Sequence, residues 1–568
     1  MVSLARARTP NIWVEPPPLS AAERAITDSP LLSAILCARG IRTADAARQF
    51  MSPATIPLGD PLLLPDMERA VATIRAAIAT GKRIVVFGDY DVDGLTSTAM
   101  VVRVLRRLGG DPACVIPHRM DDGYGLTPEM VERLLDQGVE LLVTVDCGSS
   151  NRAEFEQLIG HGVEIVVVDH HRFSGQLPDE VAYVSPRRPD NQYPFEDHAA
   201  VGVCYTLVRT LLGDADAEMY LPYVALGTVA DVVELRDENR ALVTRGLAML
   251  RRWKLPGLKA LCAAAGIDQQ AVGAWEIGYV IGPRLNAAGR IDSPQAALDL
   301  LLADDATTAT PLALKLSDLN TARQELTRRI QAEAEESIKA RGADELPAII
   351  VAGESWGIGV VGLVAGRLAE AFNRPAIVFE RGPETSRGSA RSAGDVNIVE
   401  AIAASSGLLD RFGGHRNAAG LSLATAHLEQ FERELCATVF DMLGGEYPVK
   451  EISLDAEVSP EELHLGTVSL LSRLEPFGRG NEEPRLLLRS VRHRYQKTSR
   501  DGRHLLFHAV DERGRGHGAI FFNAGHRLRE LLDSPRIDIA TNLRRDTWDG
   551  RERLKLHVSD FRASSLSS

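Results

Sequence analysis

Five aspartates and two histidines follow three apolar segments of this chain, in a pattern suited to binding metal ions. These residues are Asp89, Asp91, Asp93, Asp146, Asp169, His170 and His171. So many carboxylates repel one another unless cations lie between them. Oxygen ligands with few histidines and no thiolate suit Mg²⁺ or Mn²⁺ and suit structural zinc poorly.

The three apolar segments predict the scaffold that positions these residues. Residues 84–87, 141–145 and 164–168 are largely continuous β-branched runs separated by helical patterns. Such runs are typical of buried parallel strands. The carboxyl ends of parallel strands meet at one edge of a sheet, where ligands bind. We therefore expect the acidic residues, from three distant stretches, to gather at that edge.

Asp231 is a further candidate ligand, because it ends the otherwise apolar helical stretch 223–230. A carboxylate there is costly to bury unless it is paired or binds a metal. Two divalent ions about 3.5–4 Å apart can bind the attacking and leaving oxygens of a phosphoryl displacement and acidify a bridging water. The simpler alternative is that each aspartate caps the helix after its strand. For the whole set we favour metal binding.

Composition limits the class of protein. A chain of 568 residues is expected to form three or more domains. Its six cysteines are scattered without a C-x-x-C pair, which favours a reducing compartment over disulfides or zinc knuckles. We find neither the apolar core of a signal peptide nor an apolar stretch of about 18 residues. The expected location is cytoplasmic.

The charge is unevenly distributed. The net charge is −13, but residues 485–568 contain 18 Lys and Arg against 10 Asp and Glu, a local charge of +8. A polyanion responds to the local field rather than to the total charge, so this region could bind nucleic acid. A solvated basic face is the alternative. Aromatic residues such as Phe507, Phe521 and Phe522 suit base stacking but equally suit a barrel core.

The pattern along the chain predicts an α/β protein with several domains. We expect an N-terminal extension (1–75) that packs on the next domain, then a parallel-sheet domain (76–305). A long connecting helix (306–345) follows, based on the Ala-, Glu- and Arg-rich segment 316–341. A second α/β domain (346–445) precedes about five short strands (450–562), which suggest a small OB-type β-barrel.

Several motifs resemble those of the DHH phosphoesterase superfamily, and specifically its RecJ-type single-strand-specific 5′→3′ exonucleases. They are GDYDVDG (88–94), VDCG (145–148), VDHH (168–171), TVAD (228–231), IPHRMDDGYGL (116–126), GPRLNAAGRID (282–292), GSARS (388–392), GGHRNAAG (413–420) and LEPFGRGNEEP (474–484). They occur in the expected order over nearly the full length. His118 departs from the pattern, in which a polar Asn is expected before Arg119. The resemblance implies a DHH domain, a DHHA1-type second domain and an OB-type barrel.

The resemblance also assigns roles to residues of this chain. It implies two Mn²⁺ or Mg²⁺ ions held by Asp91, Asp93, Asp146, His170 and Asp231, with Asp146 bridging and Asp89 either a ligand or just behind the ligands. His171, with Asp169, would act at the scissile phosphate, where His171 stabilises developing charge, and His415 would donate to phosphate. The implied groups for the 5′ phosphate and the DNA are Arg119, Arg290, Ser389, Arg391, Asn286 and Gly414.

By the same resemblance the protein degrades single-stranded DNA from its 5′ end to 5′-mononucleotides in recombination and repair. A helicase and a single-strand-binding protein would be partners, with no membrane and no nucleotide cofactor. Two alternatives are a DHH phosphodiesterase for short oligonucleotides or cyclic dinucleotides, and a catalytically inactive replication scaffold. Such phosphodiesterases are usually shorter, and such scaffolds lose metal ligands, whereas the ligand set is complete here.

One motif points elsewhere. Residues 357–362 fit the G-x-G-x-x-G pattern of dinucleotide sites, and Glu380 roughly fits the acidic residue expected after a second strand. The pattern is weak alone. We favour a loop whose backbone lies near nucleic acid over a site for NAD.

Overall fold

A computed structural model describes residues 11–118, 125–172, 175–510, 514–548 and 551–565. The chain forms two compact units. One comprises residues 57–448, and the other combines residues 1–56 with residues 449–568. Within the described ranges, no helix has both the length and the apolar character needed to cross a bilayer.

The first sheet of the 57–448 unit is entirely parallel, with strand order β3-β2-β4-β5-β6. Its strands are β2 (Ile84–Gly88), β3 (Ala113–Val115), β4 (Leu141–Val145), β5 (Glu164–Val168) and β6 (Ala182–Val184). Every residue of β2 and β4 is buried, which explains why these strands are continuous apolar runs rather than alternating ones. The predicted strands 141–145 and 164–168 have the observed bounds.

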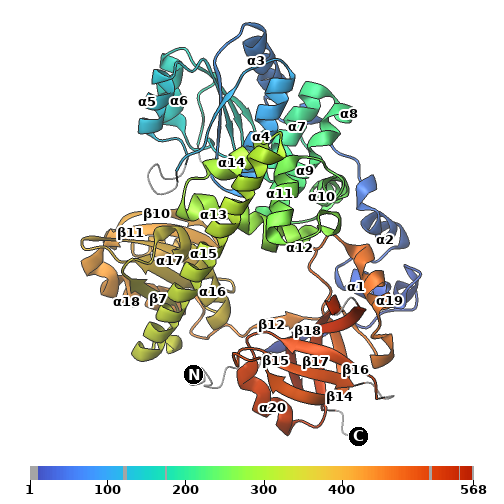
Figure 1. The fold of residues 1–568 in the computed structure, drawn as a ribbon. Helices are drawn as coiled ribbons and strands as arrows, with labels where there is room; N and C mark the ends of the chain where they lie inside the picture. Colours follow the sequence, from blue (N-terminus) through green and yellow to red (C-terminus); the bar gives the residue numbers. More distant parts are fainter. Residues whose placement is uncertain (1–10, 119–124, 173–174, 511–513, 549–550, 566–568) are drawn as a thin grey trace. The chain divides into compact units, whose positions relative to one another are not determined.

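Helices cover both faces of this sheet (Figure 1). They are α3 (Met67–Ala79), α4 (Val92–Arg107) and α7 (Ala200–Leu212) on one face, and α5 (Pro128–Asp136) and α6 (Arg152–Gly160) on the other. Alternate strand residues therefore enter separate cores: Val86 and Val143 pack with α4, whereas Phe87 and Leu142 pack with α5 and α6. The acidic residues at the strand ends thus rest on a rigid, doubly covered layer.

A helical region and one very long helix follow. The shorter helices are α8 (Asp214–Ala217), α9 (Leu221–Ala230), α10 (Asp237–Leu250), α11 (Pro256–Ala265), α12 (Ala274–Glu276), α13 (Gly282–Ile291) and α14 (Gln295–Leu302). The long helix α15 (Ala306–Arg341) has 36 residues and includes Pro311 near its start. Asp305 caps its first turn by accepting the N–H of Thr308, and Gly342 ends it with a φ of 64°.

The second sheet of this unit is mixed, with strand order β10-β11-β9-β8-β7. Its strands are β7 (Ile349–Gly353), β8 (Ala376–Glu380), β9 (Thr385–Arg391), β10 (Leu409–His415) and β11 (Ala418–Ala424), and its helices are α16 (Ile358–Phe372), α17 (Ile398–Ala403) and α18 (Leu428–Met442). Only β7 and β8 are parallel; the remaining pairs are antiparallel. The predicted α/β class with two α/β domains is confirmed.

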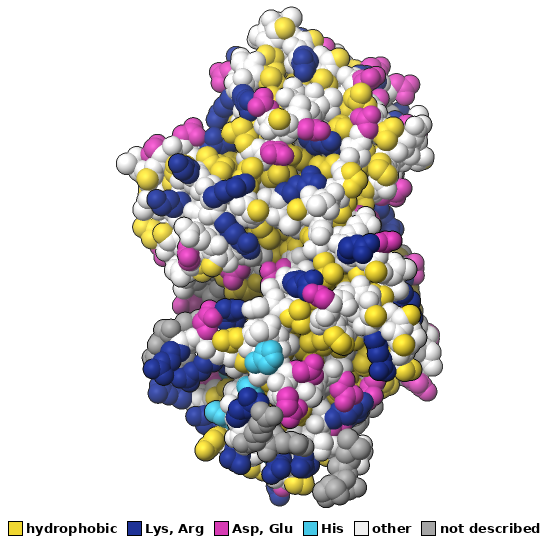
Figure 2. Space-filling model, turned by 90° about the vertical axis from the view of Figure 1, so that its right-hand side faces the viewer, with side chains coloured by type: hydrophobic (Ala, Val, Ile, Leu, Met, Phe, Trp, Pro, Cys, Tyr) yellow, Lys and Arg dark blue, Asp and Glu magenta, His cyan; other side chains and the backbone are white. Residues whose placement is uncertain are grey.

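The other unit contains a closed β-barrel. Its elements are β12 (Glu451–Ser453), β13 (Ala456–Glu457), α19 (Leu465–Leu471), β14 (Leu486–Thr498), β15 (Leu505–Val510), β16 (Gly516–Phe521), α20 (Leu528–Asp533), β17 (Ile537–Trp548) and β18 (Arg551–Ala563). Strand β14 pairs with both β15 and β17, so β14 to β18 form a closed ring, as expected for an OB-type barrel. Phe507 lies in its core, 1% exposed, whereas Phe522 is 49% exposed. Lys, Arg and His side chains are visible on its surface in the lower half of Figure 2.

The N-terminal segment belongs to the barrel unit. Helix α1 (Pro30–Ala38) buries Leu32, Ile35 and Leu36 in the barrel core, and β1 (Ile12–Val14) pairs in parallel with β12. Helix α2 (Ala44–Met51) adds Ala47 to that core. The expectation that this extension packs on the following domain is therefore wrong for the described residues 11–56, which belong to the barrel unit. The surface against which this segment packs is formed by barrel residues near the other end of the chain. A local sequence pattern does not reveal a contact between segments so far apart.

Candidate metal and phosphate site

The loop after β2 folds tightly so that its aspartates converge. Asp91 caps α4, because its Oδ1 accepts the N–H groups of Asp93 at 2.9 Å and Gly94 at 3.1 Å. The alternative, that these aspartates cap helices, thus holds for Asp91. The cap uses only one of its two carboxylate oxygens, so it does not exclude metal binding. Gly94 is required here, because a Cβ would lie 2.5 Å from the backbone oxygen of Asp89.

Asp93 is buried in the first turn of α4, with 1% of its surface exposed. Its two oxygens accept the first N–H groups of α7, from Ala200 at 2.6 Å and Val201 at 2.9 Å. These donors explain how the carboxylate tolerates burial. Burial and the charge of Asp91 nevertheless raise the pKa of Asp93 to about 7. An added cation would restore the ionised form.

Asp146 follows β4 in the left-handed region, with a φ of 60°. This conformation is uncommon for residues other than glycine and tolerable for Asp. The side chain is almost fully buried, and its Oδ1 accepts no hydrogen bond from the described residues. Burial first, and then the charge of Asp93, raise the pKa of Asp146 well above its usual range. A buried carboxylate oxygen without a donor is the expected mark of a cation ligand.

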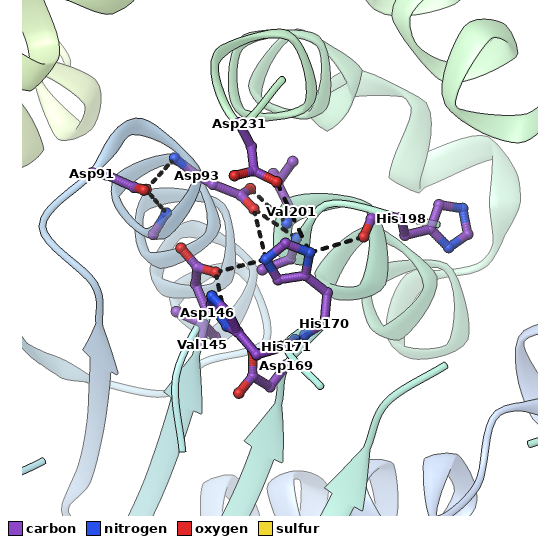
Figure 3. Close-up of polar contacts among 12 residues, drawn as sticks. Asp91, Asp93, Val145, Asp146, Asp169, His170, His171, His198, Val201 and Asp231 are labelled. Atoms are coloured by element: carbon purple, nitrogen blue, oxygen red, sulfur yellow. Dashed lines mark hydrogen bonds and ion pairs between the residues drawn. The ribbon is translucent and has the colours of Figure 1, made fainter. Parts of the chain in front are cut away.

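His170 presents one ring nitrogen to these carboxylates (Figure 3). Its Nδ1 donates to the backbone oxygen of His198 at 3.0 Å, because a carbonyl can only accept. Its Nε2 lies 3.3 Å from Asp146 Oδ1 and 4.0 Å from Asp93 Oδ2. Burial and the charge of His171 lower the pKa of His170 to about 4, so the ring is neutral at pH 7. A neutral imidazole held through its other nitrogen is the form that binds metals.

Asp169 points away from this cluster and holds His171. Its Oδ1 accepts from His171 Nδ1 at 2.8 Å and from the backbone N–H of His170 at 2.8 Å, while its Oδ2 accepts from the N–H of Ser149. Burial disfavours the charged form of His171. The hydrogen bond from His171 Nδ1 to Asp169 and the charge of Asp169 outweigh this effect and raise the pKa of His171 to about 9. The imidazolium is therefore fixed next to the cluster, 3.8 Å from Asp146 Oδ1.

The predicted carboxylates and histidines form three overlapping groups that could hold metal ions. These are Asp146 with His170 and His171, Asp93 with His170 and Asp231, and Asp89 with Asp91 and Asp146. Asp146 belongs to two of them, as a bridging ligand would. Asp231 lies at the C-terminal end of α9, and 24% of its side chain is exposed, so it is less buried than the sequence suggested. The donor set fits hard divalent cations.

Two backbone contributions to this site leave no sequence signature. The amides of Ala200 and Val201 bind Asp93, and the carbonyl of His198 orients His170. His198 is itself buried, with its Nε2 3.3 Å from Glu238 Oε2. Sequence analysis missed these residues because the chemistry comes from main-chain groups and from the start of a helix rather than from a motif.

The predicted phosphate-binding residues meet around the start of α16. Arg391 Nη1 donates to Ser389 Oγ at 3.0 Å, so these β9 residues share a face as expected for alternate strand positions. Arg290, on α13, donates to the backbone oxygen of Gly359 at 3.3 Å. Asn286 is half-buried on the same helix. Arg119 lies outside the described residues.

The G-x-G-x-x-G loop explains this arrangement. A Cβ at Gly359 would lie 1.9 Å from the backbone oxygen of Arg290, and a Cβ at Gly362 would lie 2.9 Å from Ser389 Oγ. The glycines therefore allow α13 and β9 to approach α16 closely. Close packing accounts for the pattern without a dinucleotide.

Gly414 and His415 lie at the end of β10. Gly414 has a φ of 145°, and a Cβ there would lie 2.3 Å from the backbone oxygen of Ala418, so only glycine fits. Burial lowers the pKa of His415, and the charge of His171 contributes to this shift. His415 therefore lies within electrostatic range of His171 although it belongs to the second sheet.

Three family models match this chain: the DHH family N-terminal domain over residues 83–228, the DHHA1 domain over 346–441 and the RecJ OB domain over 454–560. Curated relatives include the single-stranded-DNA-specific exonuclease RecJ of Bacillus subtilis, 33% identical over 94% of this chain and 68% of the relative. The RecJ of Haemophilus influenzae is 33% identical over 95% of each chain.

Solved structures give the same result. The crystal structure of RecJ in complex with Mn²⁺ from Thermus thermophilus has a TM-score of 0.82 and 32% identity, and the match covers 98% of this chain and 80% of that one. The Mg²⁺ complex from the same organism has a TM-score of 0.76. The curated relatives, the order of the three family models and the group of aspartates and histidines at the edge of the parallel sheet all agree. The chain therefore belongs to the RecJ family of DHH exonucleases.

Proposed function

We propose that this protein is a single-strand-specific 5′→3′ exonuclease that hydrolyses phosphodiesters and releases 5′-mononucleotides from DNA. One observation carries the proposal: Asp146 joins two groups of potential ligands beside an immobilised imidazolium. This arrangement supplies sites for cations and a hydrogen-bond donor at one point, as phosphoryl transfer requires. Relatives described as single-stranded-DNA-specific exonucleases support the same reaction.

Asp89, Asp91, Asp93, Asp146, His170 and Asp231 would hold two divalent ions, Mn²⁺ or Mg²⁺. When bound, such ions neutralise phosphate charge and lower the pKa of a coordinated water. The complete ligand set argues against an inactive scaffold. Similarity to RecJ proteins over nearly the whole of this chain argues against a phosphodiesterase specific for short oligonucleotides.

The protein groups around the ions would divide the remaining work. His171, kept protonated by Asp169, donates to the scissile phosphate and stabilises charge that develops there. His415 donates to phosphate from the second sheet, beside Gly414. Arg290, Ser389 and Arg391, with Arg119 and Asn286, hold the 5′ phosphate and set the position of the first linkage.

The proposed setting is DNA recombination and repair, with a helicase supplying single strands and a single-strand-binding protein covering them. The basic barrel supports contact with a polyanion, because its surface carries Lys and Arg in excess. We also propose the domain bounds inferred from the sequence for residues 76–305, 306–345, 346–445 and 450–562.

Internally labelled DNA tests the proposed reaction. The purified chain with Mn²⁺ should release mononucleotides from single strands with free 5′ ends. It should leave strands with blocked 5′ ends and fully duplex DNA intact. Turnover restricted to oligonucleotides of a few residues would favour the short-substrate phosphodiesterase, and release from 3′ ends would contradict the assigned polarity.

A further inference from the structure

A buried arginine on the long helix has no acidic partner. Arg323 of α15 is 9% exposed, and the one hydrogen bond of its side chain within the described residues runs from Nη2 to Asn320 Oδ1 at 2.8 Å. Its Nε is buried without an acceptor. A guanidinium removed from water is normally paired with a carboxylate, because burying an uncompensated charge is costly. This side chain therefore needs an anion that the described protein residues do not supply.

Two further arginines lie within electrostatic range of Arg323. Arg284 of α13 is half-buried and donates to Ser317 Oγ at 3.3 Å and to the backbone oxygen of Val280 at 2.8 Å, but to no carboxylate among the described residues. Arg367 of α16 donates to Gln331 Oε1 at 3.0 Å. Burial and the charges of Arg367 and Arg284 lower the pKa of Arg323. Arg323 is thus repelled by cations on two neighbouring helices.

These helices also carry the predicted phosphate residues. Helices α13, α15 and α16 pack against each other (Figure 1). Arg290 lies on α13, and Ser389 approaches α16 at Gly362. The arginine cluster is separate from that pocket, because the charges acting on Arg323 are those of Arg284 and Arg367 rather than Arg290 or Arg391, and its side chain bonds to Asn320. An extended strand entering the first pocket would bring further phosphates past the same helices.

We propose that Arg323, with Arg284, Arg367 and Asn320, forms a second phosphate-binding site that holds an internal phosphodiester of the bound single strand. Arginine suits this role because its planar guanidinium donates in parallel to two phosphate oxygens. The amide of Asn320 orients Arg323 and is itself 3% exposed. The identity of the strand rests on the proposed function, whereas the preference for a phosphate group rests on the cluster itself.

Substitution Arg323→Met removes the charge and keeps most of the side-chain length. The matched control is Arg329→Met on the same helix, an exposed arginine whose Nε lies 3.7 Å from Glu333 Oε1. Binding of the full chain to single-stranded DNA is measured in EDTA, so that no hydrolysis occurs. We expect Arg323→Met to weaken binding about tenfold. The slope of log K against log salt concentration should become shallower by about 0.7, as expected for the loss of one phosphate contact. Arg329→Met should match the unmodified protein, and Arg323→Lys should fall between them.

A neutral-linkage scan identifies the ligand. Methylphosphonate placed at successive linkages should weaken binding to the unmodified protein strongly at one internal position. The same substitution should have no effect on Arg323→Met. Removal of the 5′-terminal phosphate should weaken both proteins equally, because that group occupies the other pocket.

Thermal unfolding in inorganic phosphate separates this proposal from the proposed function. Phosphate should raise the Tm of Arg329→Met more than that of Arg323→Met, and Arg323→Met should be at least as stable as the unmodified chain without phosphate. If phosphate has this effect on Tm but the protein binds no DNA, the phosphate site stands, its ligand is free phosphate, and the proposed exonuclease function is rejected. The proposed site would be overturned if Arg323→Met were less stable than the unmodified chain but bound DNA equally well, with the same linkage scan and the same response to phosphate. Arg323 would then have only a structural role.

Discussion

At the residue scale, Asp146 combines three properties that belong together at a metal site. It is buried, its backbone is left-handed, and other carboxylates surround it. Its position after a strand was predictable from sequence, because the apolar run 141–145 ends there. Its left-handed conformation was not, because no motif encodes φ at an aspartate.

Substitution Asp146→Asn should abolish nucleotide release and stabilise the metal-free protein. Asn tolerates the φ of 60°, so backbone strain does not confuse the result. Loss of a metal ligand should reduce kcat by about a thousandfold or more. Removing a buried charge among like charges should raise the free energy of unfolding in EDTA by roughly 1–3 kcal/mol at pH 8.

This stabilisation should depend on pH with a defined sign. The pKa of Asp146 is raised in the folded protein, so its stability contribution is present at low pH and is lost as pH rises. The advantage of Asp146→Asn over the unmodified chain should therefore grow from pH 4 to pH 8. Urea unfolding in EDTA measures it, and an advantage that shrinks with rising pH would contradict the repulsion argument.

Metal affinity should also rise with pH. At pH 6 Asp93 is mostly protonated, because burial and Asp91 raise its pKa to about 7. A bound cation must displace that proton, and the raised pKa of Asp146 means that this carboxyl must also lose its proton, so Mn²⁺ affinity should increase at least about tenfold from pH 6 to pH 8. His170, with a pKa of about 4, contributes no proton in this range. Calorimetry in buffers of different ionisation enthalpy measures the released proton, and binding without proton release would contradict the assignment.

At the element scale, glycines set how closely the helices approach the cluster. The Cα of Gly227 on α9 faces α4 so closely that a Cβ would lie 2.5 Å from Thr96 Oγ1 and 2.8 Å from Asp93 Oδ1. Helix α9 also presents Asp231, so its distance from α4 fixes one group of ligands. The helix and its apolar character were predictable from sequence, but the contact that requires glycine was not.

Substitution Gly227→Ala should therefore weaken metal binding as well as the fold. Separation of α9 from α4 should cost about 1–3 kcal/mol and lower Mn²⁺ affinity, because Asp93 and Asp231 move apart. Gly160→Ala at the end of α6 is the control, because nothing lies within 4 Å of a Cβ there. Unchanged stability and affinity in Gly227→Ala would show that the helices can adjust freely.

At the scale of the whole molecule, the two ends of the chain build one unit. The barrel was largely predictable from about five short alternating runs, although β17 and β18, with 12 and 13 residues, are long strands that include many charged residues. The contribution of α1 to the barrel core was not predictable, because its apolar face fits any hydrophobic partner.

Substitution Leu36→Ala should selectively destabilise the barrel unit. Leu36 is fully buried among barrel residues, so the cavity should cost about 2–5 kcal/mol. Amide exchange should accelerate in β14 and β15 and stay unchanged in β4 and β5. Leu62→Ala, at a residue 50% exposed, is the control. Equal acceleration in both sheets, or none in the barrel, would contradict the assignment of α1 to that unit.

The central claim is that the aspartates at the edge of the parallel sheet hold two cations that catalyse hydrolysis. The most direct measurement is an Mn²⁺ titration of the metal-free chain in which bound ions and nucleotide release are followed in the same sample. We predict two bound ions per chain, release that appears only as the second site fills, and loss of both signals in Asp146→Asn. Full activity with one ion bound, or unchanged binding in Asp146→Asn, would contradict the claim.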